Sequence, residues 1–303
     1  MTNLILDTDF ETDCDDAGAL CVLHSLAQHG IVNILGVVAS VHSPWPAAAV
    51  SAMNTALGRP DIPVGENRTR PNAPCYLAHR RETEKRLYHR AIAERFPPGK
   101  TEDAVELYLR LLDQAEDSSV TICSIGLMTV LAEVMRRPDG MELIRRKVLR
   151  MISMADGFPV EGGSGFNWNM DPDATETVIN DWPVELLISP VGTDVLTGLT
   201  LETLAADNPL RCAYEIWSGE RGFRRPSWDQ LAVLAASGIA FREGFLETTR
   251  RGKIVYNAAK GQHCWTLDDH GLHTCLGLCH NAEATAEWVE PFMREPWMTE
   301  RKN

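Results

Sequence analysis

The sequence has 303 residues, of which 44% are hydrophobic and 23% are charged, and these values are ordinary for a globular protein with a sizeable core. Its formal net charge of −13 argues against nucleic acids and anionic membranes as partners, because both carry the same sign of charge. The sequence contains no apolar run of transmembrane length and does not begin with a signal-peptide pattern. We therefore expect a cytoplasmic protein.

The first segment of the chain combines a short apolar run with a dense group of carboxylates. Residues 4–6 are typical of a buried strand, and the ten residues from Asp7 to Asp16 carry five Asp and one Glu. Residues 17–29 then follow a helical apolar spacing that ends at Gly30. Like charges this close disfavour each other's ionisation, so the carboxylates either share protons or bind a hard cation. Calcium fits better than magnesium because it accepts irregular, highly coordinated oxygen shells.

A purely structural role is the alternative for this acidic loop. Asp15 or Asp16 would cap the following helix, and a second carboxylate would be stabilised by the positive end of the helix dipole. Capping leaves Asp7, Asp9 and Asp13 without a role. We therefore predict that the loop binds a metal ion or takes part in catalysis.

Strand-like and helix-like segments alternate along most of the chain. We predict strands over 31–40, 62–64, 120–124, 148–154 and 184–188, and helices over 47–57, 82–96, 102–116, 127–136, 174–180 and 201–218. The alternation indicates one α/β domain over residues 1–303, with a mainly parallel sheet covered by helices on both faces. Ligands of such sheets bind beyond the carboxyl ends of the strands. The loops at 7–16, 41–46, 124–129 and 156–169 and the segment 226–230 are therefore candidate site segments.

A cysteine- and histidine-rich stretch runs from His263 to His280. A zinc site is conceivable there, but the spacing lacks the paired C-x2-C arrangement typical of one. The pattern instead predicts strands over 253–257, 262–267 and 273–278, which together form a small C-terminal β-hairpin. The eight cysteines are scattered, and several lie in apolar segments, which favours free buried thiols.

Several motifs resemble the calcium-dependent nucleoside hydrolases, the inosine–uridine-preferring family. They are Asp7-Thr8-Asp9 with Asp15-Asp16 after an apolar strand, Gly126-Leu127-Met128-Thr129 at the family's Gly-Leu-Thr-Asn position, the segment 166–174, and the late pair Trp228-Asp229. The resemblance covers most of the chain. It implies a Rossmann-like fold with a mixed central sheet, a homodimer or homotetramer, and hydrolysis of nucleosides in purine salvage.

The resemblance also implies roles for the matching residues. It makes Asp9, Asp16, Asp229 and the backbone carbonyl of Met128 the calcium ligands, gives ribose contacts to Asp15 and Asn167, and leaves Asp7 to support the cluster from behind. The implied cofactor is calcium, which binds the ribose hydroxyls and a water molecule. Asp9 would take the proton of that water as it attacks the anomeric carbon. Asp15 would stabilise the oxocarbenium-like transition state.

The chain departs from the family at the position two residues before Asn167. The family usually has Glu there, whereas this chain has Gly165. The preceding loop, residues 156–164, also looks shorter and lacks an obvious Asn. We therefore expect an altered contact with the 5′ end of the ribose, with Asn169 as a candidate to take it over, or a substrate with a different 5′ group.

A second departure concerns the leaving base. Pyrimidine-cleaving members have His before the late Asp, where this chain has Trp228. Purine-specific members resemble it, and an indole face attracts a protonated purine through stacking and cation–π attraction. A core tryptophan is the alternative. Trp45, Trp168 and Tyr76 are candidates for a second stacking face.

Two other functions compete with this interpretation. A haloacid dehalogenase-type phosphatase also begins with a strand and Asp-x-Asp, but it needs Thr or Val where this chain has Glu11. A non-catalytic protein that binds a nucleoside or sugar with calcium is the other alternative, and Gly165 is the residue that favours it.

Overall fold

A ten-stranded sheet organises the computed structural model, which describes residues 1–11, 13–84, 87–155, 165–219 and 223–298. The strand order is β11-β10-β12-β7-β6-β5-β1-β2-β3-β4. The bounds are β1 Thr2–Thr8, β2 Val32–Ala39, β3 Val64–Glu66, β4 Thr101–Asp103, β5 Val120–Ser124, β6 Val148–Met154, β7 Glu185–Ser189, β10 Leu246–Asn257, β11 Gln262–Leu267 and β12 His273–Leu278. Strand β10 pairs antiparallel with both of its neighbours, and the other pairs of this sheet are parallel. The predicted mainly parallel, mixed sheet is confirmed.

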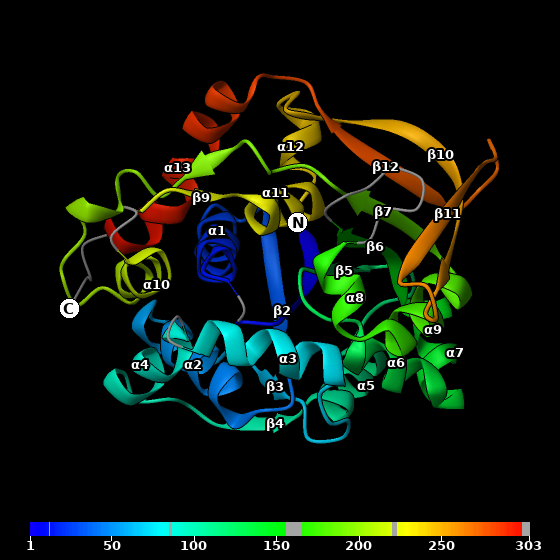
Figure 1. The fold of residues 1–303 in the computed structure, drawn as a ribbon, viewed down its shortest axis with the longest axis horizontal. Helices are drawn as coiled ribbons and strands as arrows, with labels where there is room; N and C mark the ends of the chain where they lie inside the picture. Colours follow the sequence, from blue (N-terminus) through cyan, green and yellow to red (C-terminus); the bar gives the residue numbers. More distant parts are fainter. Residues whose placement is uncertain (12, 85–86, 156–164, 220–222, 299–303) are drawn as a thin grey trace.

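Helices cover both faces of this sheet (Figure 1). The helices are α1 Asp15–Gln28, α2 Pro44–Ala56, α3 Pro74–Thr83, α4 Tyr88–Arg95, α5 Ala104–Gln114, α6 Thr129–Arg136, α7 Pro138–Lys147, α8 Phe166–Met170, α9 Pro172–Asp181, α10 Pro209–Ser218, α11 Trp228–Ala236, α12 Ile239–Arg242 and α13 Ala282–Met298. Helices α1, α2, α10 and α11 share one hydrophobic core, and α5, α6 and α9 share the other. None of the described helices is both long enough and apolar enough to cross a bilayer.

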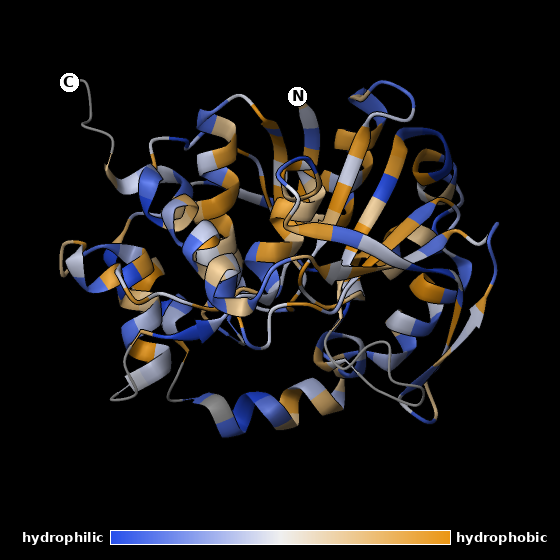
Figure 2. Ribbon diagram, turned by 90° about the horizontal axis from the view of Figure 1, so that it is seen from above, coloured by the Kyte–Doolittle hydropathy of each residue, from blue (hydrophilic) through white to orange (hydrophobic). Residues whose placement is uncertain are grey.

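Strand β1 separates the two cores because its side chains alternate between the faces of the sheet. Leu4 and Leu6 belong to the core of α1 and α11, and Ile5 belongs to the core of α5 and α6. All three side chains are fully buried, as expected for a strand covered on both faces. Figure 2 shows the hydrophobic colour concentrated on the central strands.

Several boundaries differ from the sequence-based prediction. The helix expected over 201–218 is divided into a 3-10 turn at Leu201–Thr203 and α10, because Asn208 caps the N-terminus of α10 with Pro209 following it. Within the range of the helix expected over 82–96, α3 ends at Thr83 and α4 covers only Tyr88–Arg95. The C-terminal hairpin is present, but it extends the main sheet through the parallel pairing of β12 with β7. A separate short pair joins β8 (Leu196–Thr197) and β9 (Arg225–Pro226).

Parallel strands bring their carboxyl ends to the same edge of the sheet. Strands β1, β5 and β6 are adjacent and end at Thr8, Ser124 and Met154. The acidic loop after β1 and the turn after β5 therefore lie side by side. Helix α11 packs against β5, β6 and α1, so that its N-terminus reaches the same edge.

Candidate active site

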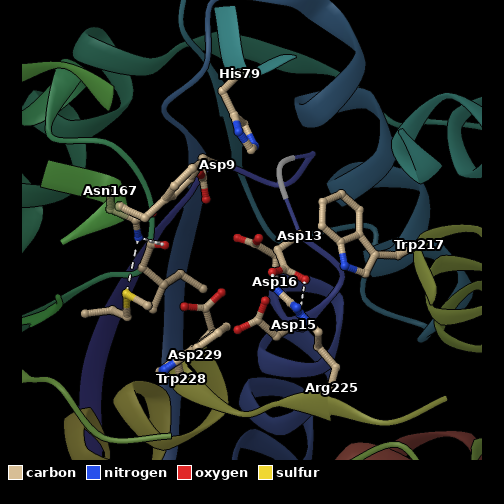
Figure 3. Close-up of a pocket in the computed structure, with 13 residues that line it drawn as sticks. Asp9, Asp13, Asp15, Asp16, His79, Asn167, Trp217, Arg225, Trp228 and Asp229 are labelled. Carbon is tan, nitrogen blue, oxygen red and sulfur yellow. Dashed lines mark hydrogen bonds and ion pairs between the residues drawn. The ribbon is translucent and has the colours of Figure 1, made fainter. Parts of the chain in front are cut away.

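A cavity of about 220 Å³ lies at this edge of the sheet (Figure 3). Its walls come from segments that are far apart in the sequence. The lining residues are Asp9, Asp13, Asp15, Asp16, His79, Ile125, Met154, Phe166, Asn167, Trp217, Arg225, Trp228 and Asp229. The acidic loop, the turn after β5, α8 and the start of α11 thus meet around one space, as the topology predicts.

Three carboxylates form the centre of the cavity. Asp15 and Asp16 lie in the first turn of α1, and Asp229 lies in the first turn of α11. One carboxylate oxygen from each lies within 4.8 Å of the others, and all three side chains are at most 4% exposed. The positive ends of two helix dipoles therefore face this acidic cluster, which offsets part of its repulsion.

Burial is the main cause that raises the pKa of Asp16 and of Asp229 well above the usual range. The neighbouring carboxylates raise both pKa values further. The cluster thus concentrates negative charge where water cannot screen it, and an oxygen-only set of this kind fits a hard cation.

Asp9 lines the same cavity directly after β1 and is 1% exposed. The Thr8 hydroxyl donates a hydrogen bond to Asp16, which ties the end of β1 to α1. Gly126 packs so closely against the backbone of the acidic loop that a Cβ atom at this position would lie 2.4 Å from the Asp9 nitrogen. The turn after β5 therefore needs glycine to approach the catalytic candidate so closely.

Asp7 lies behind the cavity and not among the described residues that line it. Its Oδ2 accepts a hydrogen bond of 2.9 Å from the Tyr108 hydroxyl, and its backbone carbonyl accepts one from the Ile125 amide. Burial raises the pKa of Asp7, and the charge of Asp9 raises it further. The supporting role of Asp7 stays a prediction.

The main-chain ligand is expected at Met128, which lies in the turn after β5 and directly precedes α6. Among the described lining residues Met128 does not occur, whereas Ile125 does. The Met128 carbonyl accepts the amide of Ala132 at the start of α6, and its side chain packs in the core of α5 and α6. Ile125, the first residue after β5, lines the cavity, whereas Met128 directly precedes α6, and its role as a main-chain ligand stays a prediction.

The two asparagines of α8 have different surroundings. Asn167 lines the cavity, and its Nδ2 donates a 2.7 Å hydrogen bond to the Ile125 carbonyl. Asn169 instead accepts a 2.6 Å hydrogen bond from the Tyr256 hydroxyl on β10 and is not among the described lining residues. Gly165 immediately precedes α8. The loop 156–164, expected to be short and without a suitable Asn, lies outside the described residues.

Of the aromatic residues proposed to contact the base, one lines the cavity and three lie elsewhere. Trp228 lines the cavity, and its Nε1 donates to the Thr193 hydroxyl at 3.1 Å. Trp168 is buried in the core with its Nε1 donating to Ser153, and the Tyr76 hydroxyl donates to Glu11. Trp45 packs against the core beside α2, with Arg90 over its ring. None of these three is among the described residues that line the cavity.

Sequence reasoning missed four residues of the cavity wall. They are His79 on α3, Met154 at the end of β6, Trp217 on α10, and Arg225 on β9. His79 packs edge-on against Phe166, with ring centroids 4.7 Å apart, and burial lowers its pKa. Only Arg225 had a local signal, since it lies three residues before the Trp-Asp pair.

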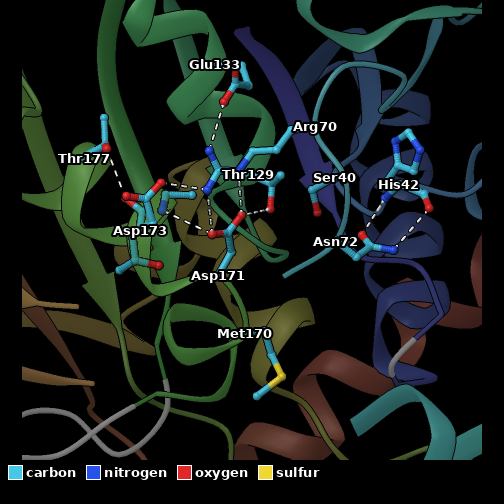
Figure 4. A network of polar contacts seen from close by, with 12 residues as sticks. Ser40, His42, Arg70, Asn72, Thr129, Glu133, Met170, Asp171, Asp173 and Thr177 are labelled. Atoms are coloured by element: carbon cyan, nitrogen blue, oxygen red, sulfur yellow. Dashed lines mark hydrogen bonds and ion pairs between the residues drawn. The ribbon is translucent and has the colours of Figure 1, made fainter. Parts of the chain in front are cut away.

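A polar network holds the outer side of this region in place (Figure 4). Thr129, at the start of α6, donates to the Asp171 carboxylate at 3.0 Å, and Asp171 also caps α9. Arg70 contacts Asp171 and Asp173. The turn after β5 and the connection between α8 and α9 are thereby fixed to each other, which fixes Ile125 relative to Asn167.

Comparisons with known proteins point to one family. Residues 4–270 match the sequence profile described as inosine-uridine preferring nucleoside hydrolase. An uncharacterized Schizosaccharomyces pombe protein is 27% identical over 186 residues, which cover 58% of this chain and 57% of that protein. The chain therefore aligns with little more than half the length of this curated relative.

Solved structures share the fold. A purine-preferring ribonucleoside hydrolase from Gardnerella vaginalis is similar with a TM-score of 0.71 and 15% identity, covering 97% of this chain and 98% of that one. The type III effector protein XopQ, solved in complex with adenosine diphosphate ribose, is similar with a TM-score of 0.75 and 14% identity, covering 97% and 94%. With the sequence profile matched over residues 4–270, this chain belongs to the inosine-uridine preferring nucleoside hydrolases, a family of N-glycosyl hydrolases.

Proposed function

We propose that this protein hydrolyses the N-glycosidic bond of a ribonucleoside, or of a 5′-modified relative, to free base and ribose, with calcium as its cofactor. The observation that carries the proposal is the buried cluster of Asp15, Asp16 and Asp229 in a cavity that Asn167 and two tryptophans also line. The carboxylates can bind a cation and the hydroxyl groups of a sugar, and the indole rings can stack on a base. The family to which the chain belongs, the inosine-uridine preferring nucleoside hydrolases, supports a nucleoside as the substrate.

The carboxylates that would hold calcium are Asp9, Asp16 and Asp229, with Asp15 beside them. The main-chain ligand would be the carbonyl of Met128, as the family resemblance implies, and the Ile125 carbonyl already accepts a hydrogen bond from Asn167. When bound, calcium supplies a positive centre that orients the ribose hydroxyls and lowers the pKa of a water molecule. Calcium is preferred to magnesium because the set is crowded, irregular and made of oxygen atoms.

The protein's own residues carry out the remaining steps. Asp9 takes the proton of the water that attacks the anomeric carbon, and Asp15 holds a ribose hydroxyl and stabilises the positive charge of the transition state. Asn167 holds another part of the sugar. Asp7, hydrogen-bonded to Tyr108, keeps the end of β1 in position from behind.

We propose a preference for purine bases, because Trp228 and Trp217 offer indole surface at the same end of the cavity. A two-ring base buries more area against such a surface than a one-ring base. Trp228→Ala should reduce turnover of inosine or guanosine by about tenfold, in line with one lost aromatic contact. Turnover of nitrophenyl riboside should change much less, and equal losses on both substrates would identify Trp228 as a packing residue.

A panel of purine and pyrimidine nucleosides, assayed for released ribose with and without calcium, tests the proposal. Purine ribosides should be cleaved in calcium and not in chelator. Binding without turnover of any riboside would favour the alternative of a calcium-dependent binding protein. Release of phosphate from a phosphomonoester would favour the phosphatase, although five aspartates line the cavity and would repel that substrate.

The proposal includes assembly into a homodimer or homotetramer, as expected from the family resemblance. Light scattering coupled to size-exclusion chromatography measures this directly. A monomer at assay concentrations would remove the oligomer from the proposal without affecting the chemistry.

A further inference from the structure

Arg225 lies in the aromatic part of the cavity, and Asn167 lies on the other side of the carboxylates (Figure 3). The Arg225 Cζ atom lies 5.2 Å from the ring centre of Trp228 and 5.6 Å from that of Trp217. Arg225 is the only Lys or Arg among the described lining residues. The guanidinium therefore lies beside the two tryptophans, where we propose that the base binds.

Asp13 fixes the orientation of this guanidinium. Its carboxylate accepts from the Arg225 Nε at 2.6 Å and contacts a second guanidinium nitrogen. Asp13 is itself held, because its Oδ1 accepts the Cys14 amide at 2.6 Å and its carbonyl accepts the Tyr88 hydroxyl at 2.7 Å. A guanidinium has five N–H donors, and a side-on carboxylate uses two of them. Asp13 therefore acts as a positioning residue for Arg225.

This cation lies at the proposed base position, so it acts on the charge of a departing base more directly than the carboxylates farther away do. A purine protonated before bond cleavage would be a second cation beside Arg225, and like charges repel each other. A base that departs as an anion would instead be attracted to the guanidinium.

We propose that Arg225, oriented by Asp13, stabilises the negative charge that develops on the leaving base, and that it selects bases with a ring carbonyl oxygen. The inference rests on the proposed function and deepens it. A 6-oxopurine can place that charge on its carbonyl oxygen, where a guanidinium N–H donates to it. Adenine has an amino group at the same position and cannot accept this hydrogen bond in the same way.

The reaction balances without a further reactant. The bond between C1′ and the base nitrogen breaks, and its electron pair goes to the base and delocalises onto the carbonyl oxygen beside Arg225. The oxygen of the attacking water forms a bond to C1′ and gives its proton to Asp9. The base anion then takes a proton from solvent, and Asp9 returns its proton to solvent. Arg225 stays protonated throughout, since burial lowers its pKa only to about 10.

The test compares inosine, adenosine and nitrophenyl riboside in steady-state assays of calcium-loaded protein. The wild type should prefer inosine to adenosine by at least about tenfold in kcat/KM. Arg225→Gln should lower kcat for inosine by about a hundredfold, typical of one lost donor to a developing anion. Adenosine and nitrophenyl riboside should change by less than about threefold, because neither leaving group depends on this donor.

Three variants separate this role from a structural one. Arg225→Lys keeps the charge and should restore part of the inosine rate. Asp13→Asn should reduce the preference for inosine over adenosine, since it weakens the ion pair that orients the Arg225 guanidinium. Arg224→Gln is the matched control, because Arg224 is exposed and lies outside the cavity wall, and it should leave all three rates unchanged. Equal losses on all substrates in Arg225→Gln, or a wild type that prefers adenosine, would overturn the proposal.

Binding of the free bases, measured by calorimetry, distinguishes failure of this inference from failure of the proposed function. Hypoxanthine should bind more tightly than adenine, and Arg225→Gln should remove the difference. If no riboside is cleaved but this binding pattern holds, the proposed hydrolysis is wrong and the recognition by Arg225 stands. If ribosides are cleaved and both bases bind equally in wild type and variant, the assignment of Arg225 is wrong and the hydrolysis stands.

Discussion

At the scale of single residues, the acidic loop divides its carboxylates between different tasks. Asp9, Asp15 and Asp16 line the cavity beside Asp229, Asp7 lies behind it, and Asp13 pairs with Arg225. The Glu11 carboxylate has different partners: its Oε1 lies 2.8 Å from the Arg80 Nε, and its Oε2 lies 3.0 Å from the His89 Nε2. Burial lowers the pKa of His89 to about 3 and raises that of Glu11. A run of similar side chains therefore serves at least four separate environments.

These placements predict unequal effects of substitution in the loop. Asp9→Ala should lower kcat/KM for inosine by about 10³-fold or more, because it removes both the general base and a calcium ligand. Asp13→Asn should lower it by about tenfold or less, because Asp13 acts only through Arg225. Steady-state assays with protein saturated in calcium measure both. Similar losses from the two variants would show that the roles within the loop are misassigned.

At the scale of elements, the site depends on how closely the turn after β5 approaches the end of β1. A Cβ atom on Gly126 would lie 2.4 Å from the Asp9 nitrogen and 2.5 Å from the Thr8 carbonyl carbon. Both contacts are with backbone, which cannot rotate away as a side chain would. The turn and the acidic loop therefore have to move apart if this glycine is replaced.

Gly126→Ala should therefore destabilise the fold by about 1–3 kcal/mol, as expected for an overpacked site, and should weaken calcium binding as well. Thermal unfolding and calcium titration measure the two effects. Gly58→Ala is a matched control, since Gly58 has a positive φ of 79° with open space around its Cα. It should cost about 1 kcal/mol through backbone strain and leave calcium affinity unchanged. Normal calcium affinity in Gly126→Ala would contradict the argument.

The start of α8 carries a second prediction at this scale. Gly165 precedes the helix with φ −69° and ψ 147°, an extended conformation open to any residue. Glycine is therefore not required by the backbone here, and it offers no side chain to bind a 5′-hydroxyl. We expect 5′-deoxyinosine to be cleaved at least as fast as inosine. A strong preference for the free hydroxyl would show that another residue makes this contact.

At the scale of the whole molecule, the acidic cavity links stability to pH and to metal. Burial raises the pKa of Asp16 and Asp229 in the folded protein, whereas the same groups ionise near pH 4 in the unfolded chain. Between the two pKa values the folded state holds more protons than the unfolded state. The stability contributed by these groups is therefore present at acid pH and is lost as pH rises through this window.

Metal-free protein should accordingly lose thermal stability as the pH rises above about 4, the value at which these groups ionise in the unfolded chain. Asp229→Asn should flatten this loss and raise the Tm of the metal-free protein at neutral pH. Calcium at a hundred times its Kd should stabilise the wild type by about 2.7 kcal/mol, more than the same concentration of magnesium, and should do little for the variant. Chelation should abolish activity. Identical pH profiles for the two proteins, or full turnover without metal, would contradict the proposed cation site.

The sequence by itself determined the parts of this protein that local pattern encodes. An apolar run flanked by carboxylates identified β1 and the acidic loop, and the alternation of strands and helices identified the parallel sheet. The late Trp228-Asp229 pair was found because its residue types are unusual before an apolar helix, and the structure brings it to the same cavity. Such signals are readable because neighbouring residues share one element and one periodicity.

Only the tertiary structure decided which distant side chains meet. Trp217 and His79 look like ordinary helix residues in the sequence, and they reach the cavity through the packing of α10 and α3. Trp168 looked equally suitable and is a core residue. These outcomes depend on contacts between segments far apart in the chain, and local periodicity carries no information about those contacts.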